Sequence, residues 1–126
     1  VVCTQQSKMD LATYLSSPHI GVSSRRTGVL LEDIYLNRQQ LSRQVFLRCQ
    51  HYATALQVLA QYPNAILTIP QSILNHLHYA ETLQIHALPI ELPKITMGMY
   101  WHDHVKQNPR HQFLRHEILN IFNAKP

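Results

Sequence analysis

The sequence predicts an α/β domain with a mostly parallel sheet flanked by helices. The hydrophobic period switches repeatedly between two and 3.6 along the chain, as it does where strands and helices alternate. The predicted strands are short apolar runs without polar alternation, which suits a sheet covered on both faces. The chain has 126 residues, of which 45% are hydrophobic and 14% charged, so it can bury a core of its own.

The predicted strands are runs of aliphatic and β-branched residues. The most apolar of them runs from Ala65 to Ile69 and ends at Pro70. A connector bracketed by Pro89 and Pro93 precedes the last one. The full set of predicted strands is 1–4, 19–23, 43–49, 65–69, 84–88 and 94–102.

The predicted helices begin and end at capping or breaking residues. Asp10 can cap a short helix that Pro18 terminates, and Asn108 can cap a helix whose first position is Pro109, where proline is tolerated. Aliphatic stripes at helical spacing indicate core-facing helices in the middle of the chain. The predicted helices cover 11–15, 29–36, 53–62, 70–82 and a segment from 109 onward.

Composition argues against several classes of protein. No apolar run approaches the roughly 20 residues of a membrane span, and the start of the sequence lacks a signal-peptide pattern. The net charge is +4, but the basic residues are scattered and do not form a nucleic-acid-binding face. Cys3 and Cys49 form no CxxC motif, so we expect free thiols in a reducing compartment, here the cytoplasm.

Short motifs follow one another in a characteristic order, the most specific in the last third of the chain. They are Pro18-His19 before a strand, His51-Tyr52 at a helix start, Pro70 after a strand, Trp101-His102, and Asn108-Pro109-Arg110-His111 at a helix start. This order resembles the second lobe and C-terminal tail of the effector-binding domain of LysR-type transcriptional regulators. The motifs most resemble those of the branch that contains nodulation and aromatic-degradation regulators. Phe113 stands where the family often has Trp, and Gln61 to Asn64 replace its glycine-rich turn.

The resemblance implies one lobe of a periplasmic-binding-protein-like (type II) fold and a ligand-sensing, non-enzymatic role without a cofactor. It assigns residues 1–89 to the second, effector-binding lobe and residues 90–126 to a strand and helix that return to the first lobe. Nearly all of the first lobe and the N-terminal helix-turn-helix of the family lie outside this sequence. We therefore expect a fragment whose parent contacts DNA only through that helix-turn-helix.

The resemblance also implies that the effector binds at strand ends and helix starts. The residues near 51–54 begin a helix, whose free N–H groups attract anions, and protonated His51 could add a charge-assisted hydrogen bond. We expect a small anionic effector, with an aromatic carboxylate as the favoured class. The predicted effector-binding residues are His19, Ser23, Ser24, Gln50, His51, Tyr52, Thr54 and Pro70.

Two other functional classes stay open: a solute-binding protein of the same fold, which would need an export signal, and a His-rich metal-binding protein. His102 and His104 form the best metal candidate, because residues i and i+2 of a strand share a face. No third ligand stands out, so we predict no metal site. We also predict no catalytic residues, since Ser23 and Ser24 lack both a nucleophile elbow and an acid that could orient a base.

The C-terminal segment should need a partner surface. One strand and one amphipathic helix are too little to bury a core alone. An uncovered apolar face and a free strand edge favour association with another chain, so we expect self-association. The side chains that need cover are Phe113, Leu114, Ile118, Ile121 and Phe122.

Overall fold

The computed structural model describes residues 1–25, 27–94, 96 and 98–123. The chain divides into two compact units, Val1–Pro93 and Lys94–Pro126. Ile90 packs against the core of the first unit, beyond the boundary predicted after residue 89. None of the helices described is long and apolar enough to cross a membrane.

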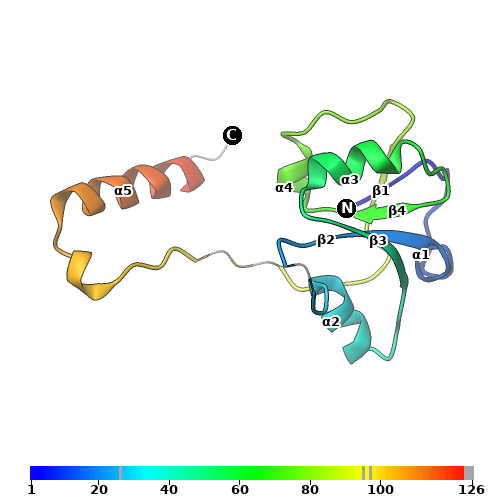
Figure 1. Ribbon diagram of the computed structural model, residues 1–126, viewed down its shortest axis with the longest axis horizontal. Helices are drawn as coiled ribbons and strands as arrows, with labels where there is room; N and C mark the ends of the chain where they lie inside the picture. Colours follow the sequence, from blue (N-terminus) through cyan, green and yellow to red (C-terminus); the bar gives the residue numbers. More distant parts are fainter. Residues whose placement is uncertain (26, 95, 97, 124–126) are drawn as a thin grey trace. The chain divides into compact units, whose positions relative to one another are not determined.

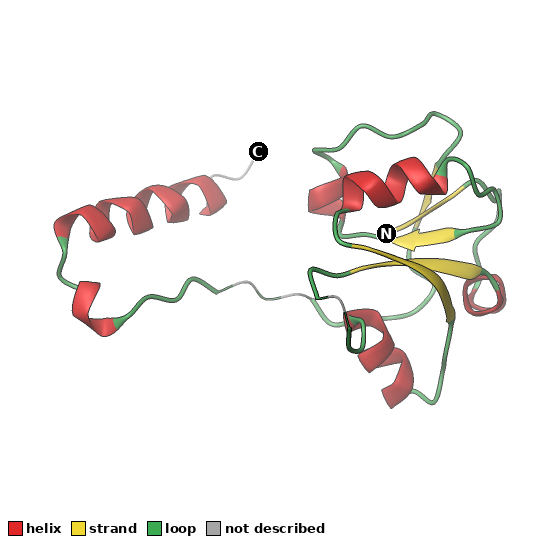
Figure 2. Ribbon diagram, in the orientation of Figure 1, coloured by secondary structure: helices red, strands yellow, loops and turns green. Residues whose placement is uncertain are grey.

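The first unit is built on a five-stranded sheet with the order β3-β2-β4-β1-β5 (Figures 1 and 2). β2 pairs in parallel with β3 and with β4, whereas β1 is antiparallel to β4 and to β5. Four of the five strands therefore run in one direction, and the predicted α/β class with a mostly parallel sheet is confirmed. The strands are β1 Val2–Thr4, β2 Pro18–Val22, β3 Gln44–Cys49, β4 Ile66–Thr68 and β5 Gln84–His86.

Helices cover both faces of this sheet. α2 and α3, the crossover helices that follow β2 and β3, lie on opposite sides of the strands (Figure 1). Neighbouring residues of β4 accordingly enter different cores: Ile66 packs with Tyr14 and Leu36, whereas Leu67 packs with the buried face of α3. The helices of this unit are α1 Leu11–Ser16, α2 Leu31–Arg38, α3 Tyr52–Leu59 and α4 Gln71–Leu74.

The predicted helix 70–82 is wrong in length. α4 ends at Leu74, which is buried, and the chain then turns so that Leu77 and Ala80 pack against the core that contains α3. Asn75, His76 and His78 have modest helix propensity, so little opposes this early end. The hydrophobic spacing alone could not separate a helix from a turn that buries the same side chains.

The predicted strand 94–102 is also absent from the part of it that the structure describes. Ile95 and Met97 lie outside the described residues, and residues 94, 96 and 98–102 belong to no strand. A strand exists only by pairing, and the described residues offer this segment no partner strand. The apolar pattern of this segment is therefore compatible with a strand, but no described strand pairs with it.

The second unit contains a 3-10 helix, η1 Asp103–Val105, and the helix α5 Pro109–Asn123. The predicted cap is present: Asn108 Oδ1 accepts the backbone N–H groups of Arg110, at 3.0 Å, and His111. Arg115 lies over the ring of Trp101 at 4.6 Å and donates to the carbonyl oxygen of Lys106 at 2.8 Å. These contacts tie α5 to the residues that precede it.

The end of α2 generates a stability prediction. Gln40 has a φ of 59°, and the N–H groups of Gln40 and Leu41 bond the carbonyl oxygens of Asn37 and Leu36. This is the Schellman arrangement, in which glycine is preferred at the left-handed position. Gln40→Gly should therefore raise the free energy of unfolding by about 1 kcal/mol, measured by urea denaturation.

Gln57→Gly is the matched control, because Gln57 is also an exposed glutamine but lies inside α3. That substitution should lower the free energy of unfolding by roughly 0.5–1 kcal/mol. Equal effects of the two substitutions would contradict the geometry at Gln40.

Candidate functional site

The candidate site lies where the carboxyl ends of β2 and β3 meet. These strands are adjacent and parallel, and their chains leave toward opposite faces of the sheet, one into α2 and the other into α3 (Figure 1). In open α/β sheets, ligands bind outside the carboxyl ends of the strands. Four of the predicted residues lie together at this edge: Ser23, Ser24, Gln50 and His51.

Backbone pairing holds the start of the β2–α2 connection in place. The N–H of Ser23 donates to the carbonyl oxygen of Cys49 at 3.0 Å, which continues the ladder by one step beyond Val22. The Oγ of Ser23 accepts the N–H of Arg25 at 3.1 Å, so this hydroxyl is part of a local turn. Ser24 is exposed and Ser23 half-buried.

α3 begins directly at the edge. His51 is its N-cap residue, with extended dihedral angles and no side-chain capping bond, and its imidazole is exposed. Among the described residues no side chain accepts the first N–H groups of α3, so these donors face solvent at the positive end of the helix dipole. Thr54 is exposed in the first turn of α3.

Tyr52 supplies an apolar wall beside these donors. It is half-buried and packs against the core under α3. Burial raises the pKa of its hydroxyl, and the negative charge of Glu32 acts in the same direction. Pro70, the N-cap residue of α4, follows β4 at the same edge, because β4 is parallel to β2.

His19 lies apart from the other predicted effector residues. It is near the opposite end of β2 from Ser23, paired with Val45, and its side chain is fully buried. One ring nitrogen, Nε2, bonds the carbonyl oxygen of Tyr14 at 2.6 Å, and the other, Nδ1, faces Arg43 Nη1 at 3.4 Å. Because a guanidinium can only donate, Nδ1 accepts and Nε2 carries the proton.

Arg43 is the centre of this buried network, and sequence reasoning missed it. Its side chain is 1% exposed and forms ion pairs with Asp33 at 2.6 Å and Glu32 at 3.3 Å. Tyr14 links the network to β4, since its hydroxyl lies 2.8 Å from Thr68 Oγ1. Arg43 lies just before β3 and pairs with carboxylates in the first turn of α2, the preceding helix. No local sequence pattern predicts a contact of this kind.

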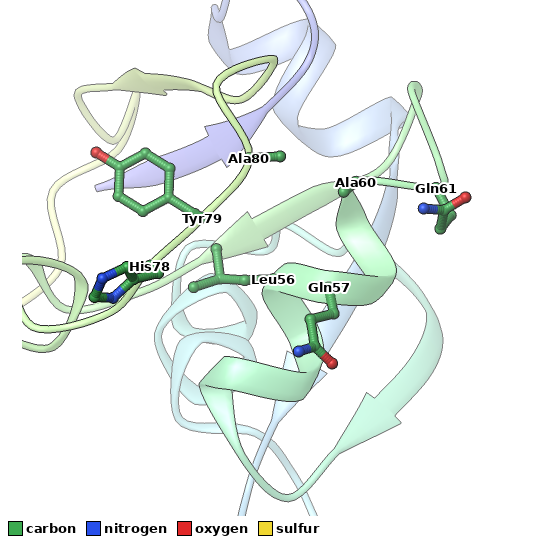
Figure 3. Close-up of a pocket in the computed structure, with 7 residues that line it drawn as sticks. All are labelled: Leu56, Gln57, Ala60, Gln61, His78, Tyr79 and Ala80. Atoms are coloured by element: carbon green, nitrogen blue, oxygen red, sulfur yellow. The ribbon is translucent and has the colours of Figure 1, made fainter.

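A separate cavity of about 360 Å³ lies near the other end of α3, away from the strand ends (Figure 3). Leu56 on α3 and Ala60 at its C-cap face the segment that carries His78, Tyr79 and Ala80. This cavity contains none of the predicted effector-binding residues.

The candidate metal pair, His102 and His104, was expected to share one face of a strand, and the structure does not show that arrangement. His102 and His104 lie at η1, not on a strand, and their Nδ1 atoms are 2.6 Å apart in an exposed pair. Within residues 1–25, 27–94, 96 and 98–123, no three His, Cys, Asp or Glu side chains cluster as metal ligands. The pair is held by its own contact and by the cap that His102 forms with the N–H of His104.

Burial of His19 predicts a pH dependence of stability. Burial lowers the pKa of His19 to about 4, from an ordinary value of 6.5, and the nearby Arg43 charge acts in the same direction. The unfolded chain therefore binds this proton more readily, and stability should fall as the pH drops from about 6.5 toward about 4. The loss should be about 3 kcal/mol by urea unfolding.

His19→Gln should flatten this dependence within that pH range, because no imidazole remains to be protonated. His104→Gln, which changes an exposed histidine, should keep the full slope. If His19→Gln retains the slope of the parent chain, another group carries the dependence.

The chain is similar in sequence to known transcriptional activators. It is 25% identical over 118 residues to the HTH-type transcriptional activator NagR of a Ralstonia species, covering 94% of this chain and 39% of NagR. It is 26% identical over 116 residues to the HTH-type transcriptional activator NahR of Pseudomonas putida, covering 90% of this chain and 38% of NahR. The chain thus spans well under half the length of these relatives. No family model matches it.

The fold has a close counterpart among solved structures. The regulatory domain of MexT, a transcriptional activator in Pseudomonas aeruginosa, matches with a TM-score of 0.77 and 21% identity, over 93% of this chain and 58% of that one. The predicted fold class is thereby confirmed. Sequence motifs, relatives and fold agree: the chain is similar to LysR-type transcriptional regulators and has the fold of the regulatory domain of MexT.

Proposed function

We propose that this chain is a ligand-sensing part of the regulatory domain of a LysR-type transcriptional activator and binds a small anionic effector. The observation that carries the proposal is the shared carboxyl edge of the parallel strands β2 and β3, with the open start of α3 beside it. Ligands of open α/β sheets bind outside the carboxyl ends of the strands, and free helix N–H groups favour anions. The relationship to HTH-type activators supports regulation over transport or metal binding.

The effector residues that we propose are those gathered at this edge. Ser24 and Thr54 offer exposed hydroxyls, His51 offers an exposed imidazole, and Tyr52 offers an aromatic surface. An aromatic carboxylate would suit this combination, with its charge toward the start of α3 and its ring toward Tyr52. His19 is left out of the proposed site, because both of its ring nitrogens already have partners inside the protein.

The whole protein would contact DNA through a segment outside this chain. The described helices and the scattered charge offer no recognition surface for DNA. We propose that effector binding in the cytoplasm alters how this domain associates with other copies and thereby acts on a helix-turn-helix elsewhere in the protein.

The first test uses benzoate as the probe. Titration followed by ¹⁵N NMR should shift the amide signals of residues 51–54, because the carboxylate binds at the open start of α3. His51→Ala should weaken the response about tenfold, the size expected for losing a hydrogen bond to a charged group. His78→Ala, an exposed histidine at the cavity of Figure 3, is the matched control and should leave the response unchanged.

Shifts confined to Leu56, Ala60 and residues 78–80 would move the site to that cavity and contradict the proposal. So would a titration in which His51→Ala and His78→Ala behave alike.

The second test concerns self-association. α5 has no buried residue, and five of its large apolar side chains are between 49% and 72% exposed: Phe113, Leu114, Leu119, Ile121 and Phe122. Burying them between copies would contribute on the order of 5–10 kcal/mol, which can offset the entropy of association. Light scattering should therefore show that the apparent mass of the chain rises with concentration.

A double substitution, Ile121→Glu with Phe122→Glu, should remove this concentration dependence, and so should deletion of residues 94–126. Asn120→Glu adds the same charge on an exposed polar position of α5 and should leave the association intact. A parent chain that stays monomeric at high concentration would rule out self-association through α5.

A further inference from the structure

Arg48 is an exposed guanidinium at the carboxyl end of β3, and neither the sequence motifs nor the comparisons single it out. Its only described hydrogen bond runs from Nη1 to the carbonyl oxygen of Gly28, at 2.7 Å. The ion pairs among the described residues join Lys8 to Asp10 and Arg43 to Glu32 and Asp33, so no described carboxylate neutralises Arg48. Its Nε and Nη2 groups have no described protein acceptor.

The strand register places Arg48 near the carboxyl edge of β2 and β3. Arg48 pairs with Gly21 of the adjacent parallel strand, and paired residues of neighbouring strands project from the same face. Gly21 has no side chain on that face, and the side chain of Leu30 occupies the position instead. A Cβ on Gly21 would lie 2.3 Å from the Cδ1 atom of Leu30. Ser23, two residues after Gly21, continues the ladder on the same face. Arg48 therefore lies on the α2 side of the same edge as Ser23. α3 begins on the other side of this edge, so a carboxylate that contacts both Arg48 and the start of α3 would lie over the edge itself, at the ends of β2 and β3.

The bond to Gly28 connects this guanidinium to α2. Gly28 belongs to residues 27–30, here called the connecting segment, which lead into α2. Gly28 has a φ of 100°, a conformation that favours glycine. Leu30, at the end of the segment, is 2% exposed and packs directly before α2.

A planar guanidinium can serve two acceptors at once. Nε and Nη2 form one edge that matches a carboxylate with two parallel hydrogen bonds, while Nη1 lies outside that edge and can keep its bond to Gly28. An anion bound in this way would share its arginine with the connecting segment. Neutral compounds could not use this contact to the same extent, so Arg48 would select for charge.

We infer that Arg48 anchors the carboxylate of the effector and couples its binding to the connecting segment. This inference rests on the proposed function, since it assigns a further residue to the same site. Binding then has two consequences: anionic ligands gain affinity over neutral isosteres, and the segment before α2 becomes more ordered because its Arg48 contact is fixed.

The experiment compares benzoate with benzamide, which has the same shape without the charge. Both are titrated by ¹⁵N NMR into the parent chain, Arg48→Gln, Arg48→Lys and Arg38→Gln. Arg38 is the matched control, because its guanidinium lies over Tyr35 at 5.4 Å on α2, near the helix end distant from the connecting segment. Hydrogen exchange at Gly28 to Leu30 is measured with and without benzoate.

Arg48→Gln should bind benzoate about tenfold more weakly than the parent chain does. The two proteins should bind benzamide with equal affinity. Arg48→Lys should fall between them, because an ammonium group cannot form the two parallel bonds. Benzoate should slow exchange at Gly28 to Leu30 in the parent chain and in Arg38→Gln, but not in Arg48→Gln.

If benzoate shifts residues 51–54 equally in the parent chain and in Arg48→Gln, the site stands and the role of Arg48 is wrong. If the parent chain gives no response at the edge to either probe, the proposed effector class is itself wrong, and the inference falls with it.

Discussion

The parallel pairing of β2 with both β3 and β4 is the constraint on which the rest of the first unit depends. Parallel neighbours cannot be joined by a tight turn, so each connection needs a crossover, and these crossovers are nearly always right-handed. The chain steps from β2 outward to β3 and then back across β2 to β4, which sends α2 and α3 to opposite faces. One pairing pattern thus covers both faces of the sheet and brings the carboxyl ends of β2, β3 and β4 to one edge.

A second consequence of this arrangement is a polar interior on the α2 side. Tyr14, His19, Arg43 and Thr68 meet there and are joined to Glu32 and Asp33 at the start of α2. Such a network is costly if any member loses its partner, because a buried charge or donor would then be left unpaired. It also ties α1, α2, β2, β3 and β4 together by directional bonds, so the network defines how α2 docks on the sheet.

Arg43 and Arg48 divide two tasks along one strand. Arg43, before β3, has its charge satisfied by two carboxylates inside the protein. Arg48, near the end of β3, bonds a backbone carbonyl oxygen and has no carboxylate partner among the described residues. A cation without an acidic partner attracts anions more strongly than a paired one. The same residue type therefore serves stability at one end of the strand and, in our proposal, recognition at the other.

The sequence by itself determined the order and type of most elements. Period and capping residues predicted α1 with its Asp10 cap, a core-facing α3, and α5 with its Asn108 cap, because these signals are local. The motif order also predicted the family relationship. Tertiary structure alone decided that α4 ends at Leu74, that residues 98–102 form no strand, and that His19 is buried while Arg48 is exposed. Those outcomes depend on which segments pair and pack across long separations in the chain, and no local pattern carries that information.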